Sequence, residues 1–462
     1  MGASVLVAGI SSAFGVLLLT ATGFIAAVMR ADPYLGDSET MAIVIAILSV
    51  LLLGVAVYVA AVVTANTFST IVAGRTRRIA LLRLIGASAR AQRSEVARQG
   101  LVVGVVGALL GLVLGAVAAE VLIGVGAPAL GIDVAYDVVR ADLLIPAAAV
   151  ALTTWVAAWS GSRRVLTVTP LQALGGSEQR TAIAVRRRPV RNVVVVVLFV
   201  IGATLLALGL FIGLVSPLGV VVAFLGGLAT FTAIALGATL VMPPLLHVAG
   251  RLLERLSGGS VAARLASENA TRYPERSARM AIGVVIGVTL VTMFAVAIES
   301  TKSVFTIQSG GQLPPEFAAA LDTFAAIMMG LVAVSAVIAA VGLVNLLTIG
   351  IVQRRRELGL LRALGLSAPQ VRWTVLWEAV HITATAVGFG LVLGVAYGWV
   401  AAQATFGSVP AALGLPVAIV APAIPWLPIV GIVVATAALT LVASVAPTRL
   451  ATRVAPIEAL AE

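Results

Sequence analysis

The sequence predicts an all-α integral membrane protein of about ten transmembrane helices, and three observations lead to this class. Of its 462 residues, 61% are hydrophobic and 11% are charged, and the mean hydropathy is +1.13. These values lie outside the range of soluble domains. Ten apolar runs reach the length of about 20 residues that a helix needs to cross a membrane core of about 30 Å. Finally, a segment of basic and apolar residues occurs twice.

The ten apolar runs predict the helices in order. They are residues 4–29, 41–66, 99–122, 143–161, 193–214, 218–246, 278–299, 321–350, 378–402 and 426–446. An even number of crossings places both termini on one side of the membrane. If that side is the cytoplasm, 27 of the 30 basic residues lie there and only Arg30, Arg140 and Lys302 lie outside. This asymmetry is typical of bacterial plasma-membrane proteins. The net charge of +11 therefore reflects topology, and no nucleic-acid partner is expected.

The duplicated segment relates two parts of the chain. RTRRIALLRLIGAS (75–88) returns 279 residues later as RRRELGLLRALGLS (354–367), with seven of 14 positions identical. The similarity continues into the following apolar run, and the short motifs VTPLQAL and VAPIEAL match after the last helix of each part. Six spans separate the two copies. The copies therefore form parallel repeats, related by an axis along the membrane normal.

These matches divide the chain into five parts. The outer loops near 123–142, 300–320 and 403–425 are each about 20 residues long, too short for a separate domain. The parts are a first helix with a short outer loop (1–40), a first unit of three helices (41–175), cytoplasmic linkers with a central helix pair (176–277), a further helix with a short outer loop (278–320) and a second unit of three helices (321–462).

Each copy of the duplicated segment predicts a helix–glycine–helix elbow on the cytoplasmic side. Leucines at helical spacing form an apolar stripe beside the arginines. Gly365 then ends the helix, and Ser367 with Gln370 forms the S-x-x-Q pattern of a capping box. Gly86 and Ser88 repeat this arrangement. Such an elbow can dock into a groove on a soluble partner, or it can lie on anionic lipid. Its occurrence at matched positions in two units favours docking.

The segments TFSTIVAGRTRRIALLRLIGAS and LLTIGIVQRRRELGLLRALGLSAPQVR resemble the FtsX-like permease family, the MacB-, LolC- and BceB-type membrane subunits of type VII ABC transporters. Two such units in one ten-helix chain are similar to the BceB-type arrangement. Two features depart from it. The large extracellular domain that BceB-type permeases carry between the seventh and eighth helices is replaced here by about 20 residues. The glutamate typical of the motif is present as Glu357, but Arg78 occupies that position in the first copy.

The resemblance implies a coupling mechanism in which the elbows engage two copies of a separate cytoplasmic ABC ATPase. That partner would bind ATP and magnesium, so no cofactor is expected in this chain. Membrane lipids and an extracellular protein are further possible partners. The residues that the family motif assigns to ATPase coupling are Arg75, Arg77, Leu82, Arg83 and Gly86 in the first copy, with Arg354, Arg356, Glu357, Leu361, Arg362 and Gly365 in the second.

The residues of this chain argue against catalysis. A Walker A loop ends in Gly-Lys-Ser/Thr, and the single lysine, Lys302, follows Thr301 in an outer segment. The chain has no cysteine and two histidines, too few for a metal site. Glu378 and His381 share a helical face, so they can pair or form an ordinary polar cluster at a helix end. We expect no enzyme activity in the chain itself.

Polar and small residues in the apolar runs suggest two further roles. Glu120 and Glu299 lie near the outer ends of their helices. Either they are solvated at the interface, or they line an outer vestibule for an amphiphile. The runs GVVGALLGLVLG and AVGFGLVLG, which follow the two elbows, permit close helix packing.

Three functions are compatible with these features. The first is the permease of an ABC system that exports or extracts a hydrophobic or amphiphilic compound, such as a lipid, peptide or drug. The second is a mechanotransmission subunit that controls an extracellular cell-wall hydrolase or sensor, which the short outer loops disfavour. The third is an ion-coupled carrier, which the lack of aspartate and lysine inside the spans disfavours.

Overall fold

The computed structural model describes two-thirds of the chain or more, with gaps. The described residues are 2–31, 46–47, 49–55, 57–59, 61–62, 65, 88–129, 134–162, 189–256, 258, 261–272, 274–308, 360, 362, 365–408 and 419–451. All regular elements in these ranges are helical, as the sequence predicts. The 321–350 span lies outside the described residues, and the 41–66 span is described only in part.

Seven helices in the described residues are long and apolar enough to cross a membrane, and shorter apolar helices cover Ser49–Val59 and Trp426–Val442. The all-α membrane class is therefore confirmed, while the number ten stays a prediction. The helices are α1 (Gly2–Ala31), α4 (Ala89–Ala129), the 3-10 turn η1 (Ala141–Leu143), α5 (Leu144–Gly161), α9 (Pro189–Gly213), α10 (Gly219–Leu236), α11 (Ala238–Leu256), α12 (Val261–Arg272), α13 (Pro274–Gln308), α16 (Ala368–Phe406) and α18 (Trp426–Ala451).

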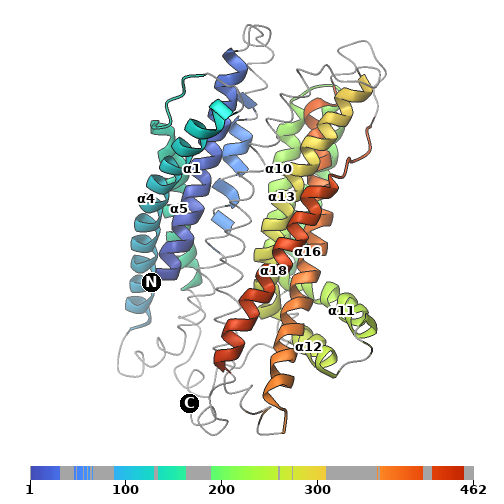
Figure 1. Cartoon of the computed structure of the whole chain (residues 1–462). Coiled ribbons are helices and arrows are strands. Elements are labelled where there is room, and N and C mark those ends of the chain that lie inside the picture. Colours follow the sequence, from blue (N-terminus) through green and yellow to red (C-terminus); the bar gives the residue numbers. More distant parts are fainter. Residues whose placement is uncertain are drawn as a thin grey trace.

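The long helices form two groups of the same design (Figure 1). In one group α1 packs along α4, and α5 runs antiparallel to both. In the other group α13 packs along α16, and α18 runs antiparallel to both. Helices α1, α4, α13 and α16 all begin at the lower end in Figure 1. We call this the inner end, because the distribution of arginine predicts that it faces the cytoplasm. A helix that precedes each repeated unit in the chain thus packs against that unit. It is α1 in the first group and α13 in the second.

Glycines in α4 and α16 bring the paired helices into close contact. A Cβ added at Gly111 would overlap the backbone of α1 at Gly9, and one added at Gly394 would overlap Thr292 of α13. With the offset of 279 residues between the copies, Gly111 corresponds to Gly390, and Gly394 corresponds to Gly115. The close packing predicted from the small-residue runs is therefore confirmed in both units.

Side-chain hydroxyls reinforce both of these helix pairs. Ser12 of α1 donates a hydrogen bond to the carbonyl oxygen of Ala108 at 3.0 Å. Thr289 of α13 donates to the carbonyl oxygen of Gly390 at 3.3 Å. Inside a membrane such bonds are worth about 0.5 to 2 kcal/mol each. They indicate that α1 and α13 hold equivalent places.

The central pair, α9 and α10, bridges the two units. The hydroxyl of Tyr58, in the 41–66 span, lies 2.7 Å from that of Thr232 in α10. The hydroxyl of Thr230 lies 2.9 Å from that of Tyr397 in α16. The ring of Phe231 stands edge-on to Tyr58, with centroids 6.2 Å apart. These contacts give the pair a role that the sequence did not reveal, since α10 connects a helix of the first unit with one of the second.

The apolar run 218–246 does not form one helix. Helix α10 ends at Leu236, and the amide of Gly237 closes it with a 2.7 Å hydrogen bond to the carbonyl of Ala233. Helix α11 begins at Ala238 and contains Pro243 and Pro244. Glycine and the proline pair weaken a continuous helix at this point. The predicted span is therefore shorter, and α11 with α12 lies beside α16 at the inner end (Figure 1).

Candidate coupling surface at the inner end

The second elbow turns at Gly365, whose φ is +102°. L-amino acids with a Cβ rarely adopt this left-handed region, whereas glycine does so readily. The amide of Gly365 donates to the carbonyl oxygen of Arg362 at 3.1 Å and so closes the preceding turn. The predicted helix stop is confirmed.

Helix α16 then begins with the predicted capping box. The hydroxyl of Ser367 accepts a hydrogen bond from the amide of Gln370, and the Gln370 side chain accepts one from the Ser367 amide at 2.8 Å. In the first copy, the hydroxyl of Ser88 accepts a bond from the amide of Ala91 at 3.1 Å. Both copies thus start their second helix with a serine cap, which satisfies amides at the helix start.

Most of the predicted coupling residues lie outside the described residues. The half-buried Arg362 and the exposed Gly365 are the two that the structure places, and both stand at the inner end just before α16. The residues outside the described ranges are Arg75, Arg77, Leu82, Arg83, Gly86, Arg354, Arg356, Glu357 and Leu361. Their role in docking therefore stays a prediction.

A cation–π contact fixes the inner end of the first unit. The guanidinium of Arg93, near the start of α4, lies 4.5 Å from the centroid of the Trp159 ring, near the end of α5. Contacts of this kind are worth about 0.5 to 2 kcal/mol. The contact holds the helix that follows the first elbow against its antiparallel neighbour.

His381 connects α16 to α11 at the inner end of the second unit. Its Nε2 donates to the carbonyl oxygen of Leu246 at 2.8 Å, and the residue is buried. Its Nδ1 has no hydrogen-bond partner among the described residues. The sequence left open a pair between His381 and Glu378, which is also buried. The imidazole also binds the backbone of another helix, a contact between distant segments that no local pattern encodes.

The two outer glutamates differ in exposure. Glu120 is exposed near the outer end of α4, and Glu299 is half-buried near the outer end of α13. Their place is compatible with both interpretations drawn from the sequence.

Outer loops fold back onto the helices of each unit. In the first, the guanidinium of Arg140 donates to the Tyr136 hydroxyl at 2.9 Å, and the Tyr136 ring stands edge-on to Phe24 of α1. Burial raises the pKa of Tyr136, and the charge of Arg140 opposes this change. In the second, the indole of Trp399 donates to the carbonyl of Val420 at 2.6 Å. These contacts position the outer ends of the bundle.

The described residues contain no group of three or more His, Cys, Asp or Glu side chains that could hold a metal ion.

Comparison with known proteins gives one match. The family model described as FtsX-like permease C-terminal matches residues 40–170 and 329–456. These two segments cover more than half of the chain and correspond to the two repeated units. A search of curated proteins found no match.

Proposed function

Because this chain belongs to the FtsX-like permease family, we propose that it is the membrane subunit of an ABC transporter in which two copies of a separate cytoplasmic ATPase hydrolyse ATP. Members of the family are membrane subunits that normally work with such an ATPase and are generally not catalytic themselves. The chain is accordingly a multi-pass protein of the bacterial plasma membrane.

The observation that carries the proposal is the matched start of the helix after each elbow. In both units a serine caps this helix, and in the second unit Gly365 sets a sharp turn before it. A rigid turn can transmit a push from a docked protein into α4 or α16 without bending. Since both units carry the motif, one permease chain would receive two ATPase copies.

We further propose that the substrate is hydrophobic or amphiphilic, such as a lipid, a peptide or a drug, and is exported or extracted. Many large apolar side chains are exposed along α4 and α9, valine and leucine on both helices and also isoleucine and phenylalanine on α9. A substrate of this class reaches the protein from the lipid phase. Glu120 and Glu299 would line the outer vestibule through which it leaves.

Co-purification of the permease with its ATPase tests the proposal. The variants are Gly86→Pro and Gly365→Pro, and the matched control is Gly258→Pro. Gly258 also has a positive φ, +63°, but it lies between α11 and α12, outside the elbows. Proline is confined to φ of about −65° and is incompatible with either site. The ratio of ATPase to permease and the ATPase rate in nanodiscs would be measured.

We expect two ATPases per wild-type permease, loss or uncoupling in the two elbow variants, and a normal ratio in the control. An ATPase rate that responds to candidate substrates would distinguish transport from control of an extracellular partner. If the wild type binds no ATPase, the elbows are lipid-surface elements, and the proposed function is wrong.

A further inference from the structure

Helix α11 leaves the bundle at the inner boundary of the membrane. His381 of α16 lies three residues inside the predicted span 378–402, which corresponds to about 4.5 Å along the helix. Its hydrogen bond to the carbonyl oxygen of Leu246 therefore fixes the middle of α11 at nearly the same depth. Figure 1 shows α11 beside α16 at the inner end of the bundle. The residues that follow Leu246 are thus placed in the zone of the lipid headgroups.

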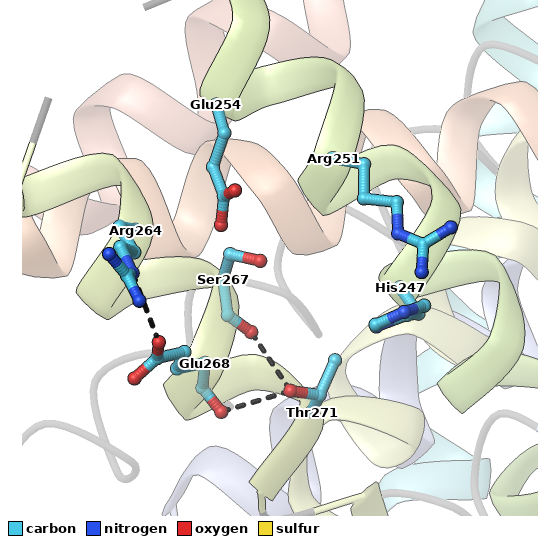
Figure 2. Close-up of a pocket in the computed structure, with 7 residues that line it drawn as sticks. All are labelled: His247, Arg251, Glu254, Arg264, Ser267, Glu268 and Thr271. Carbon is cyan, nitrogen blue, oxygen red and sulfur yellow. Dashed lines mark hydrogen bonds and ion pairs between the residues drawn. The ribbon is translucent and has the colours of Figure 1, made fainter. Parts of the chain in front are cut away.

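A polar pocket of about 450 Å³ lies between this part of α11 and α12 (Figure 2). Its lining residues are His247, Arg251 and Glu254 of α11, and Arg264, Ser267, Glu268 and Thr271 of α12. Both carboxylates in this lining are already engaged. Glu268 lies 3.3 Å from the guanidinium of Arg264, and Glu254 interacts electrostatically with His381 of α16. Neither acidic group of the pocket is therefore free to bind a cation.

The arginines of α11 face outward beside this pocket. Arg251 and Arg255 are exposed and one turn apart, so they share a face of the helix. Figure 2 shows Arg251 on the side of the pocket away from the paired Arg264 and Glu268. The structure records no ion pair of Arg251 or Arg255 with another described residue. A ligand with negative charge would complement these two guanidinium groups.

Helix α11 also exposes an apolar row next to its arginines. Val248 and Leu252, one turn apart, are 67% and 58% exposed. Because a helix turns by about 100° per residue, the order around this surface is His247, Arg251, Arg255, Val248 and Leu252. The surface thus changes from basic at the pocket to apolar on the far side. Such neighbouring rows are typical of a helix that lies in the membrane interface, with its cations among headgroups and its apolar side chains among acyl chains.

We propose that the outward face of α11, formed by Val248, Arg251, Leu252 and Arg255, binds an anionic phospholipid of the inner leaflet, of the phosphatidylglycerol type. The two guanidinium groups contact the phosphate, whose oxygens match their planar fork of donors, and the two apolar side chains insert between acyl chains. Because His381 joins α11 to α16, the bound lipid also steadies the helix that follows the second elbow. The site does not depend on the proposed function.

The position of α11 can be tested directly, because the chain has no native cysteine. Leu252→Cys would carry a fluorophore in nanodiscs of phosphatidylcholine and phosphatidylglycerol. The matched control is Glu268→Cys, an exposed position of α12 in the other wall of the pocket. Lipids with brominated acyl chains should quench the label at position 252 several-fold more strongly than the label at position 268. If they do not quench the label at position 252, α11 lies outside the membrane and the proposal is wrong.

A second experiment tests the charge of the ligand. Phosphatidylglycerol would be titrated into the purified, delipidated full chain in detergent, and bound lipid would be counted by native mass spectrometry. Each arginine near an anionic lipid surface strengthens binding by about fivefold. The double variant Arg251→Gln, Arg255→Gln should therefore lose affinity for phosphatidylglycerol by about tenfold or more. Its affinity for phosphatidylcholine, titrated in the same way, should stay unchanged.

The matched control removes the same charge from the inner end at arginines that are already paired. It combines Arg98→Gln with Arg264→Gln, whose partners are Glu95 and Glu268. Exposed ion pairs contribute little, so the affinity for phosphatidylglycerol should change by less than about twofold. Circular dichroism would verify that both double variants fold.

Four results of this experiment would overturn the proposal. Equal losses in the two double variants would reduce the effect to general surface charge. Equal affinity of the wild type for phosphatidylcholine and phosphatidylglycerol would remove the preference for an anion. Inorganic phosphate that displaces phosphatidylglycerol at equal concentration would assign the arginines to a free anion. Lost ATPase binding with unchanged phosphatidylglycerol binding in Arg251→Gln, Arg255→Gln would make this face of α11 a protein-docking surface instead.

Discussion

Single residues set the geometry of the elbow. Gly365 permits a backbone turn at φ +102°, and Ser367 starts the next helix two residues later. The two copies of the motif differ in charge at one position, because Arg78 replaces the glutamate that the second copy has as Glu357. The two docking sites should therefore be unequal.

We predict that Glu357→Arg weakens ATPase docking more than Arg78→Glu does. Glu357 belongs to the copy that keeps the family pattern, and its replacement changes the local charge by two units in a basic segment. Because like charges would then repel one another, affinity should fall about tenfold. The dissociation constant for the ATPase would be measured with the permease in nanodiscs. Equal effects of the two variants would refute the inequality.

We predict that Tyr136 ionises above its ordinary pKa of 10.0, because burial disfavours the phenolate and outweighs the attraction of Arg140. The neutral form is thus favoured by folding. Its contribution to stability is complete below the unfolded pKa and is lost as pH rises through the folded pKa. The difference in alkaline absorbance titration between wild type and Tyr136→Phe measures the folded pKa. A midpoint at or below 10.0 would contradict the burial of this ring.

At the scale of elements, close helix pairing is the repeated structural theme. Glycines on α4 and α16 remove the side chains that would separate these helices from α1 and α13. Without a hydrophobic driving force between helices in lipid, such close packing and hydroxyl hydrogen bonds supply the association. The pairs α1–α4 and α13–α16 are therefore held tightly. In each pair the second helix directly follows an elbow.

We predict that Gly394→Ala destabilises the α13–α16 pair, whereas Gly388→Ala on the same helix does not. A Cβ at position 394 would overlap Thr292, but none of the surrounding atoms lies within 4 Å of a Cβ at position 388. Overpacking of this kind costs about 1 to 3 kcal/mol. Thermal unfolding in detergent micelles would compare the two variants. A midpoint for Gly394→Ala equal to that of Gly388→Ala would mean that the helices can separate at no cost.

At the scale of the whole molecule, α10 stands between the two units. Its threonines contact Tyr58 on one side and Tyr397 on the other, while an apolar cluster joins Phe14 of α1 to Phe294 of α13. The charged residues separate toward the two ends of the bundle. Among the described residues, the outer end carries Arg30, Arg140 and Lys302, while the inner end carries Arg90, Arg93, Arg98, Arg191, Arg251, Arg255, Arg264, Arg272, Arg362 and Arg372.

We predict that the inner end faces the cytoplasm, and the lack of native cysteine makes this directly testable. Val139, before α5, and Val190, at the start of α9, are each 77% exposed and lie at opposite ends. In intact cells a membrane-impermeant maleimide should label Val139→Cys at once, and Val190→Cys only after permeabilisation. The reverse labelling pattern would invert the topology.

The sequence by itself determined the membrane class, the two related units and the local form of the elbow. Hydropathy, an ungapped repeat and the Gly-x-Ser pattern are encoded by neighbouring residues, so they can be recognised without a fold. The break at Gly237 was missed because the run 218–246 stays apolar across it, and hydropathy does not detect a change of direction.

Only the tertiary structure decided what depends on residues far apart in the chain. The equivalence of α1 and α13, the bridge from Tyr58 through Thr232 to the second unit, and the bond from His381 to Leu246 each join separate helices. The pocket between α11 and α12 also exists only once these helices have turned away from the bundle and packed together. Such contacts depend on how helices are placed in space, because a side chain's partner across a helix interface leaves no periodic pattern in the sequence.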